Sequence, residues 1–118
     1  MTNTEIELTS EQLSTINDTL RMKLITNIGT ASCERITGRL IVTRSVADLP
    51  GDQMSAVLSA VAHFNKFTEG NDPHGEHDFG SIDLFGEKWF WKFDYYEHDL
   101  EAFGHSVHVL TVMNSNDY

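Results

Sequence analysis

Cysteine is nearly absent from this chain of 118 residues, and long hydrophobic runs are absent altogether. The single cysteine, Cys33, excludes an internal disulfide and any zinc finger built from several cysteines. A chain without disulfides is typical of a reducing compartment, so we expect a cytoplasmic protein. The first residues have neither a basic segment nor an apolar core, so we expect no signal peptide. No apolar stretch approaches the roughly 20 residues that span a bilayer, and we expect no membrane association.

Basic residues are also scarce, because eight lysines and arginines stand against 18 aspartates and glutamates. The imbalance lies in the second half. Residues 1–68 hold seven acids and six bases, whereas residues 69–118 hold eleven acids and only Lys88 and Lys92. Such a surface repels phosphate groups, so we expect no direct nucleic-acid binding. It would attract a basic protein partner, such as a nucleic-acid-binding protein, although acidity also serves solubility alone.

The length indicates a single domain, residues 1–118, and the first half predicts two helices around one strand. Thr9 or Ser10 can cap the first helix, with Gln12 in the capping-box position. Its apolar stripe is Leu13, Ile16, Leu20 and Leu24; its solvent side is Glu11, Ser14, Asp18 and Arg21. A β-branched run at 36–46 predicts a strand. Asp52 can cap the second helix, whose apolar set is Met54, Val57, Leu58, Val61, Phe64 and Phe67.

Three further strands are predicted at 79–85, along the aromatic run that ends at Tyr96, and at 105–113. Gly86-Glu87 is short enough to make the first two a hairpin. Alternation places Trp89, Trp91, Phe93 and Tyr95 on a buried face, and Phe90, Lys92, Asp94 and Tyr96 on a half-exposed face. The order α-β-α-β-β-β predicts an α+β fold. We expect two layers, an antiparallel sheet of about four strands with two helices on one face.

The loop between the second helix and the hairpin carries the most chemistry. His74, Glu76 and His77 are ligand types for a divalent metal ion, although the spacing matches no established zinc motif. A metal-free alternative would use a histidine as general base. The candidate catalytic residues are His74, Glu76, His77, Asp78, Asp94 and Tyr96. A structural loop that hydrogen-bonds to the sheet edge is the third interpretation.

Acidic and aromatic side chains along the hairpin also predict a protein-binding surface, because tyrosine and other aromatic residues often carry the energy of interfaces. The candidate binding residues are Asp83, Glu87, Phe90, Asp94, Tyr96, Glu97, Asp99 and Glu101. The aromatic strand could instead seal a homodimer.

Sequence patterns over nearly the whole chain resemble an uncharacterised bacterial family, a domain of unknown function in small proteins of plasmids, phages and integrated elements. The matching segments are Asn17-Asp18 with Arg21, Gly38-Arg39 with Thr43-Arg44, NDPHGEHDFG at 71–80, FWKFDYY at 90–96 and HVLTVM at 108–113. The family carries an arginine where this chain has His108. The resemblance implies no established activity, but it implies a mobile-element setting, in which small acidic proteins that block host defence recur.

These observations lead to three hypotheses. The first is an acidic binding protein, not an enzyme and without a cofactor. It would inhibit a host nucleic-acid-binding or defence protein by occupying the basic surface of that protein. Anti-CRISPR and anti-restriction proteins that imitate nucleic acid act in this manner. The second is a small hydrolase that uses the loop from His74 to Asp78, with a divalent metal or a general base. The third is a structural or stress-related accessory domain.

Overall fold

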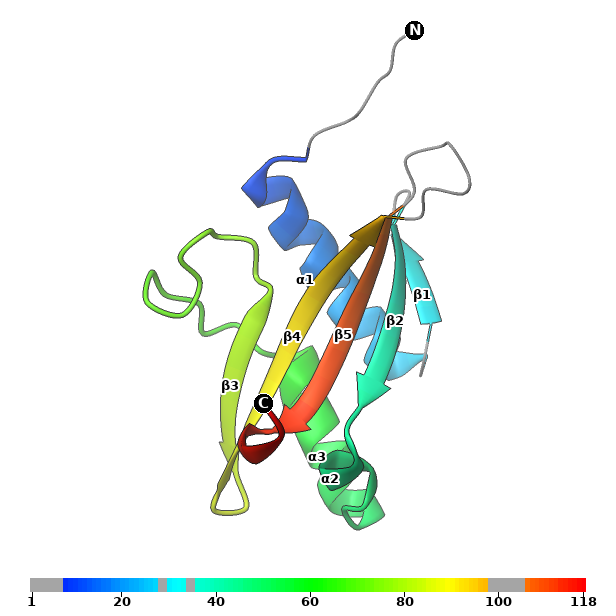
Figure 1. The fold of residues 1–118 in the computed structure, drawn as a ribbon, viewed down its shortest axis with the longest axis vertical. Coiled ribbons are helices and arrows are strands. Elements are labelled where there is room, and N and C mark those ends of the chain that lie inside the picture. Colours follow the sequence, from blue (N-terminus) through cyan, green and yellow to red (C-terminus); the bar gives the residue numbers. More distant parts are fainter. Residues whose placement is uncertain (1–7, 28–29, 34–35, 98–105) are drawn as a thin grey trace, which may run out of the picture.

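The computed structural model describes residues 8–27, 30–33, 36–97 and 106–118, and within them it shows an α+β fold of two layers (Figure 1). The elements are α1 (Ser10–Thr26), β1 (Thr30–Cys33), β2 (Ile36–Val42), α2 (Arg44–Ala47), α3 (Gly51–Ala62), β3 (Phe79–Leu84), β4 (Glu87–Glu97), β5 (Ser106–Asn114) and the 3-10 turn η2 (Ser115–Asp117). None of the described helices is long and apolar enough to cross a bilayer.

The five strands form one mixed sheet in the order β1-β2-β5-β4-β3. β2 and β5 are parallel, and the other neighbouring pairs are antiparallel. The predicted α+β class is therefore confirmed, but a sheet of four antiparallel strands with two helices is wrong in detail. The sequence analysis missed the short polar strand β1 and the helix α2. It also missed that β5 enters the sheet between β2 and β4.

Helices α1 and α3 cover one face of the sheet, which we call the helix face (Figure 1). The predicted capping box of α1 is present, with Thr9 as N-cap and Gln12 as its partner. Ile16, Leu20 and Leu24 are buried as expected. α1 lies close to β2 at Gly38, where an added Cβ would lie 3.0 Å from Leu20 Cδ2.

Two predicted element ends differ from the structure. The strand expected at 36–46 ends at Val42, because Thr43 is the N-cap of α2. The second helix ends at Ala62 and begins after Pro50, so Asp52 lies in its first turn and is not its cap. Phe64 lies beyond the helix. Phe67 also lies beyond it, yet both rings pack edge-on against Trp91.

The aromatic strand β4 has the two faces that alternation predicted. Trp89, Trp91 and Phe93 are buried under the helices, whereas Tyr95, on the same face, is 40% exposed. The opposite side, which we call the open face, carries Phe90, Lys92, Asp94 and Tyr96. The C-terminal turn η2 lies in front of this face at the lower end of β4 and β5 (Figure 1).

Candidate functional site

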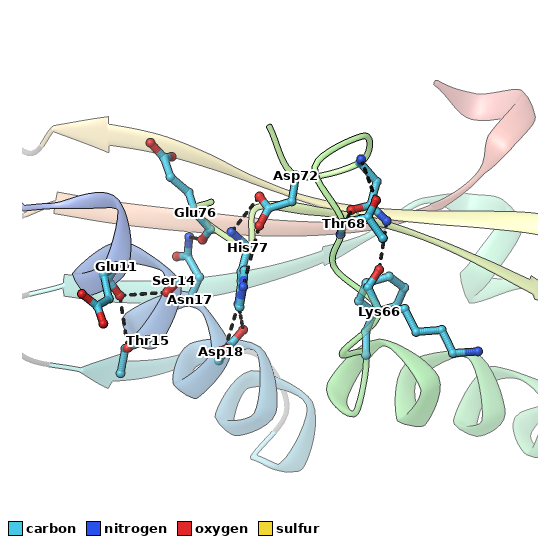
Figure 2. Close-up of polar contacts among 12 residues, drawn as sticks. Glu11, Ser14, Thr15, Asn17, Asp18, Lys66, Thr68, Asp72, Glu76 and His77 are labelled. Carbon is cyan, nitrogen blue, oxygen red and sulfur yellow. Dashed lines mark hydrogen bonds and ion pairs between the residues drawn. The ribbon is translucent and has the colours of Figure 1, made fainter. Parts of the chain in front are cut away.

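The loop that connects α3 to β3 is held in a fixed shape by its own side chains (Figure 2). Asn71 Oδ1 accepts a hydrogen bond from the backbone N–H of Thr68 at 2.8 Å, and Asn71 Nδ2 donates to the carbonyl of Lys66 at 2.9 Å. Two residues of the loop and hairpin, His77 and Phe85, have positive φ angles. Asn71 and the other turn-forming residues therefore have the structural role that the loop interpretation assigned to them.

His77 joins this loop to α1. Its Nδ1 lies 3.0 Å from both carboxylate oxygens of Asp18, and its Nε2 lies 3.7 Å from Asp72 Oδ2 (Figure 2). Its backbone N–H donates to Asp72 Oδ1 at 3.1 Å. The ring stacks on Phe67 with centroids 3.7 Å apart. Both ring nitrogens thus face carboxylates and one ring face is covered, which is an arrangement suited to fixing the loop.

Arg21 of α1 holds the start of the same loop, next to the end of α3. Its side chain is buried, with Nε donating to the carbonyl of Val61 at 2.8 Å and Nη2 donating to that of Phe64 at 2.9 Å. Nη1 lies 3.2 Å from Asp18 Oδ1, and the guanidinium lies 4.5 Å from the Trp91 ring centroid. Burial lowers the pKa of Arg21, and the Asp18 carboxylate opposes that shift. Arg21 therefore donates to one carbonyl in the last turn of α3 and to one just beyond the helix, where intrahelical donors run out.

Asn17 is the centre of a second polar network. Its Nδ2 donates to the carbonyl of Glu76 and to the hydroxyl of Tyr95, both at 3.0 Å. Its Oδ1 accepts from Nδ1 of His108 at 2.8 Å. The Tyr95 hydroxyl in turn donates to Glu76 Oε1 at 2.9 Å. All hydrogen-bonding groups of the buried Asn17 amide are thus paired, so α1, β4, β5 and the loop have one relative arrangement.

The environment shifts the pKa values of several groups in these networks. Burial lowers the pKa of His108 to about 4, so its imidazole is neutral at pH 7. Burial also raises the pKa of the Tyr95 hydroxyl above its usual range. The pKa of Asp78 is raised, first by burial and then by the neighbouring Glu76 carboxylate. The smaller contribution from Glu76 shows that the two carboxylates lie close enough to repel each other.

We call the partly exposed side chains of this region the acidic loop surface. It consists of Asp18, Glu76, Asp78 and the ring of Tyr95. No lysine or arginine occurs in the sequence between Lys66 and Lys88. A rigid loop thus presents carboxylates beside an exposed aromatic ring.

The predicted metal ligands do not converge. Within the described residues, no group of three histidine, cysteine, aspartate or glutamate side chains could hold a metal ion. His77 faces Asp18 and Asp72, the Glu76 carboxylate accepts from Tyr95, and His74 is exposed.

The predicted catalytic set is divided between two faces of the molecule. Glu76 and His77 lie with α1 on the helix side, as Figure 2 shows, whereas Asp94 and Tyr96 belong to the open face of β4. Tyr95 is the tyrosine that reaches Glu76. Alternation along a strand explains the difference, because neighbouring residues point to opposite faces.

The sequence analysis missed the residues of α1 that complete the site. It placed Asp18 and Arg21 on the solvent side, but Arg21 is only 3% exposed. A signal was available in the spacing, because Asn17 and Arg21 are four residues apart and so lie on the same side of a helix.

Three of the eight predicted binding residues lie beside groups that moderate their charge. Asp83 pairs with Lys88 at 2.9 Å, and Asp94 pairs with Lys92 at 3.0 Å. Glu87 Oε1 accepts from Asn114 Nδ2 at 2.8 Å. Of the other predicted binding residues, Phe90 packs on Phe79 and Tyr118, and Tyr96 is 56% exposed. Glu97 is the last residue of β4, and its side chain lies outside the described part. Asp99 and Glu101 lie outside the described residues.

Comparison with known proteins adds a family. Residues 42–117 match the model of a family described as "Protein of unknown function (DUF3768)". The chain belongs to this family. The DUF3768 match begins at the last residue of β2 and includes the loop and strands β3 to β5, whereas α1, with Asn17 and Arg21, precedes it. No curated protein and no solved structure matches the chain.

Proposed function

We propose that the protein is a small acidic binding protein whose acidic loop surface docks on a basic surface of another protein. The observation that carries this proposal is that Glu76 and Asp78, on a loop fixed by buried polar contacts, lie beside the exposed Tyr95 of β4. A surface that is already rigid loses little conformational entropy on binding, and a tyrosine beside carboxylates provides both contact area and charge.

The distribution of charge favours the helix side, and not the open face, as the surface that binds a basic partner. On the open face, Asp83 and Asp94 already contact lysines, and Arg39 is a further cation of that face. On the acidic loop surface, Asp18 contacts Arg21 and His77, but the Glu76 carboxylate contacts a neutral hydroxyl, and the pKa of Asp78 is raised first by burial and then by Glu76. A basic partner therefore gains more from the loop than from the open face.

The resemblance described above adds a biological setting to this proposal. A small acidic protein of a plasmid or phage has an evident target in the nucleic-acid-binding proteins of host defence. We infer an inhibitor of the anti-CRISPR or anti-restriction type, which occupies a basic groove and so competes with nucleic acid.

The alternative, a hydrolase that uses the loop from His74 to Asp78, has weaker support. A general base needs a free ring nitrogen within reach of its substrate, but both ring nitrogens of His77 face carboxylates. The residues expected to complete that site, Asp94 and Tyr96, belong to the opposite face of the sheet.

A pull-down with two charge-reversed baits tests the binding proposal. Asp78→Lys lies in the acidic loop surface. Asp48→Lys makes the same change of charge at an exposed position between α2 and α3. We expect a nucleic-acid-binding protein from the native host to be retained by the wild type and by Asp48→Lys. With Asp78→Lys we expect an affinity about tenfold or more lower, because an attractive contact becomes repulsive.

The captured protein must then pass two further tests. Its complex should weaken as salt rises, because exposed charges are screened. Its binding to nucleic acid should fall when the wild-type protein is added in stoichiometric amount. Equal capture by both variants, or unchanged nucleic-acid binding, would contradict the proposal.

A further inference from the structure

The open face of the sheet has an apolar centre that the described residues leave partly uncovered. Its central strand, β5, places Val107, Val109 and Thr111 on this face, and all three are half-exposed. Two apolar side chains on the flanking strands are more exposed, namely Ile41 at 51% and Tyr96 at 56%. Exposed apolar area of this kind, continuous across three strands, marks an interaction surface.

The charged side chains of this face are arranged symmetrically about β5. The register places Arg39 of β2 and Asp94 of β4 on either side of Val109, in one row across the sheet. A row further along, Ile41 and Lys92 flank Thr111 in the same way. In the row of Val109, β2 and β4 therefore carry opposite charges at equal distances, about 4.8 Å, from the central strand, whereas in the row of Thr111 only Lys92 is charged.

This arrangement is self-complementary. A rotation of 180° about an axis parallel to β5, passing in front of Val109, places a second copy face to face with the first and exchanges the positions of β2 and β4. Arg39 of each copy then lies opposite Asp94 of the other, and Val109 meets its own counterpart on the axis. Two-fold interfaces are isologous, so each contact occurs twice.

We propose that the open face is the interface of a homodimer, with Val107 and Val109 at its centre and two reciprocal Arg39–Asp94 ion pairs. Two sheets pack about 10 Å apart, a distance that valine and tyrosine side chains fill. When two twisted sheets pack with aligned strands, one sheet is rotated by about 30° relative to the other. Residues on β2 and β4, one strand away from the axis, are then displaced along the strand direction by less than the length of one residue. Asp94, which contacts Lys92 of its own chain, would contact Arg39 of the second copy as well.

The C-terminal turn sets the lower limit of this interface. Met113 belongs to the open face but is only 3% exposed. Tyr118 packs edge-on against Phe90, with ring centroids 5.7 Å apart. Figure 1 shows this turn in front of the lower sheet, so the second copy contacts the region from Thr111 to Val107. The acidic loop surface lies on the other side of the molecule and stays accessible in the dimer.

Sedimentation or light scattering at tens of micromolar protein measures the oligomeric state. We expect twice the 13.3 kDa chain mass for the wild type. Val109→Glu puts two carboxylates on the axis and should give a monomer. Arg39→Glu and Asp94→Arg should each shift the equilibrium toward monomer. The double variant, Arg39→Glu with Asp94→Arg, should restore the dimer, because the ion pairs re-form with their polarity exchanged.

Circular dichroism and thermal unfolding show which variants fold. If Val109→Glu does not fold, the double variant still decides the test. Lys88→Glu is the matched control, since it reverses a charge at the hairpin end of the open face, away from the proposed axis. A monomeric wild type overturns the proposal. In that case a different partner or another segment of the chain would cover this face. A dimer that the Arg39 and Asp94 changes leave intact also overturns it.

Discussion

At the residue scale, three side chains of α1 determine how the functional loop is held. Asn17 contacts Glu76, Tyr95 and His108, and Asp18 lies within hydrogen-bonding distance of His77. Arg21 caps the end of α3 and lies over Trp91. Each of these contacts joins residues 40 or more positions apart in the sequence. Their loss should therefore affect the whole fold and not only the loop.

Replacement of Arg21 tests this role. Arg21→Ala removes the side-chain donors of the Val61 and Phe64 carbonyls and a buried side chain, so the free energy of unfolding should fall by about 3 kcal/mol. Lys23→Ala on the same helix is the control, because Lys23 is exposed and its hydrogen bond to the carbonyl of Ser32 is 3.3 Å long. Urea unfolding measures both. Equal effects would contradict a structural role for Arg21.

His108 makes the stability depend on pH. The unfolded chain takes up a proton near pH 6.5, but the folded protein resists protonation until about pH 4, because its imidazole is buried. Its contribution is thus present above pH 6.5 and is lost as the pH falls from 6.5 to 4, by roughly 3 kcal/mol in total at 1.4 kcal/mol per unit.

Unfolding curves between pH 7 and 5 test this expectation, since that window lies above most carboxylate titration. The wild type should lose stability across it, and His108→Gln should lose less because glutamine does not titrate. Identical slopes for the two proteins would show that His108 is not the group responsible.

At the element scale, the hairpin of β3 and β4 depends on one close approach. An added Cβ at Gly80 would overlap the indole Nε1 of the fully buried Trp91, which pairs with it across the strands. Buried indoles in a packed core have no room to move aside. The identity of this residue is therefore fixed by packing, and the backbone conformation of the strand does not require a glycine.

Gly80→Ala should lower the free energy of unfolding by about 3 kcal/mol or more through overpacking. Gly70→Ala is the matched control, because the nearest atom to its added Cβ, Thr68 Oγ1, is at an ordinary 3.7 Å and the site is exposed. Thermal or urea unfolding compares them. A Gly80→Ala protein as stable as the control would show that Trp91 can repack.

The sequence predicted some elements better than others for physical reasons. The capping box at Thr9 and the alternation from Trp89 to Phe93 are local signals, and both were confirmed. The end of α3 was placed too late, because Phe67 continues the helical spacing while its ring reaches the core from a loop. Apolar spacing reports which residues are buried, and the backbone that carries them can differ.

At the scale of the whole molecule, the sequence did not predict the strand order or the contacts of α1 and Tyr95 with the candidate residues Glu76 and His77. Periodicity assigns residues to faces, but it does not say which strands are neighbours, and so the parallel pair of β2 and β5 was missed. The site depends on contacts such as Asn17 to His108, which are 91 positions apart. The acidic half was recognised from composition, but its division into a lysine-paired open face and an acidic loop surface needed three dimensions.

The position of β5 has a consequence for biosynthesis. β5 is the last of the five strands to leave the ribosome, yet it occupies the middle of the sheet between β2 and β4. Until it emerges, the nascent chain holds two separate strand pairs with unsatisfied edges, which are exposed to aggregation and to chaperones. The sheet is therefore completed only after synthesis has passed Asn114.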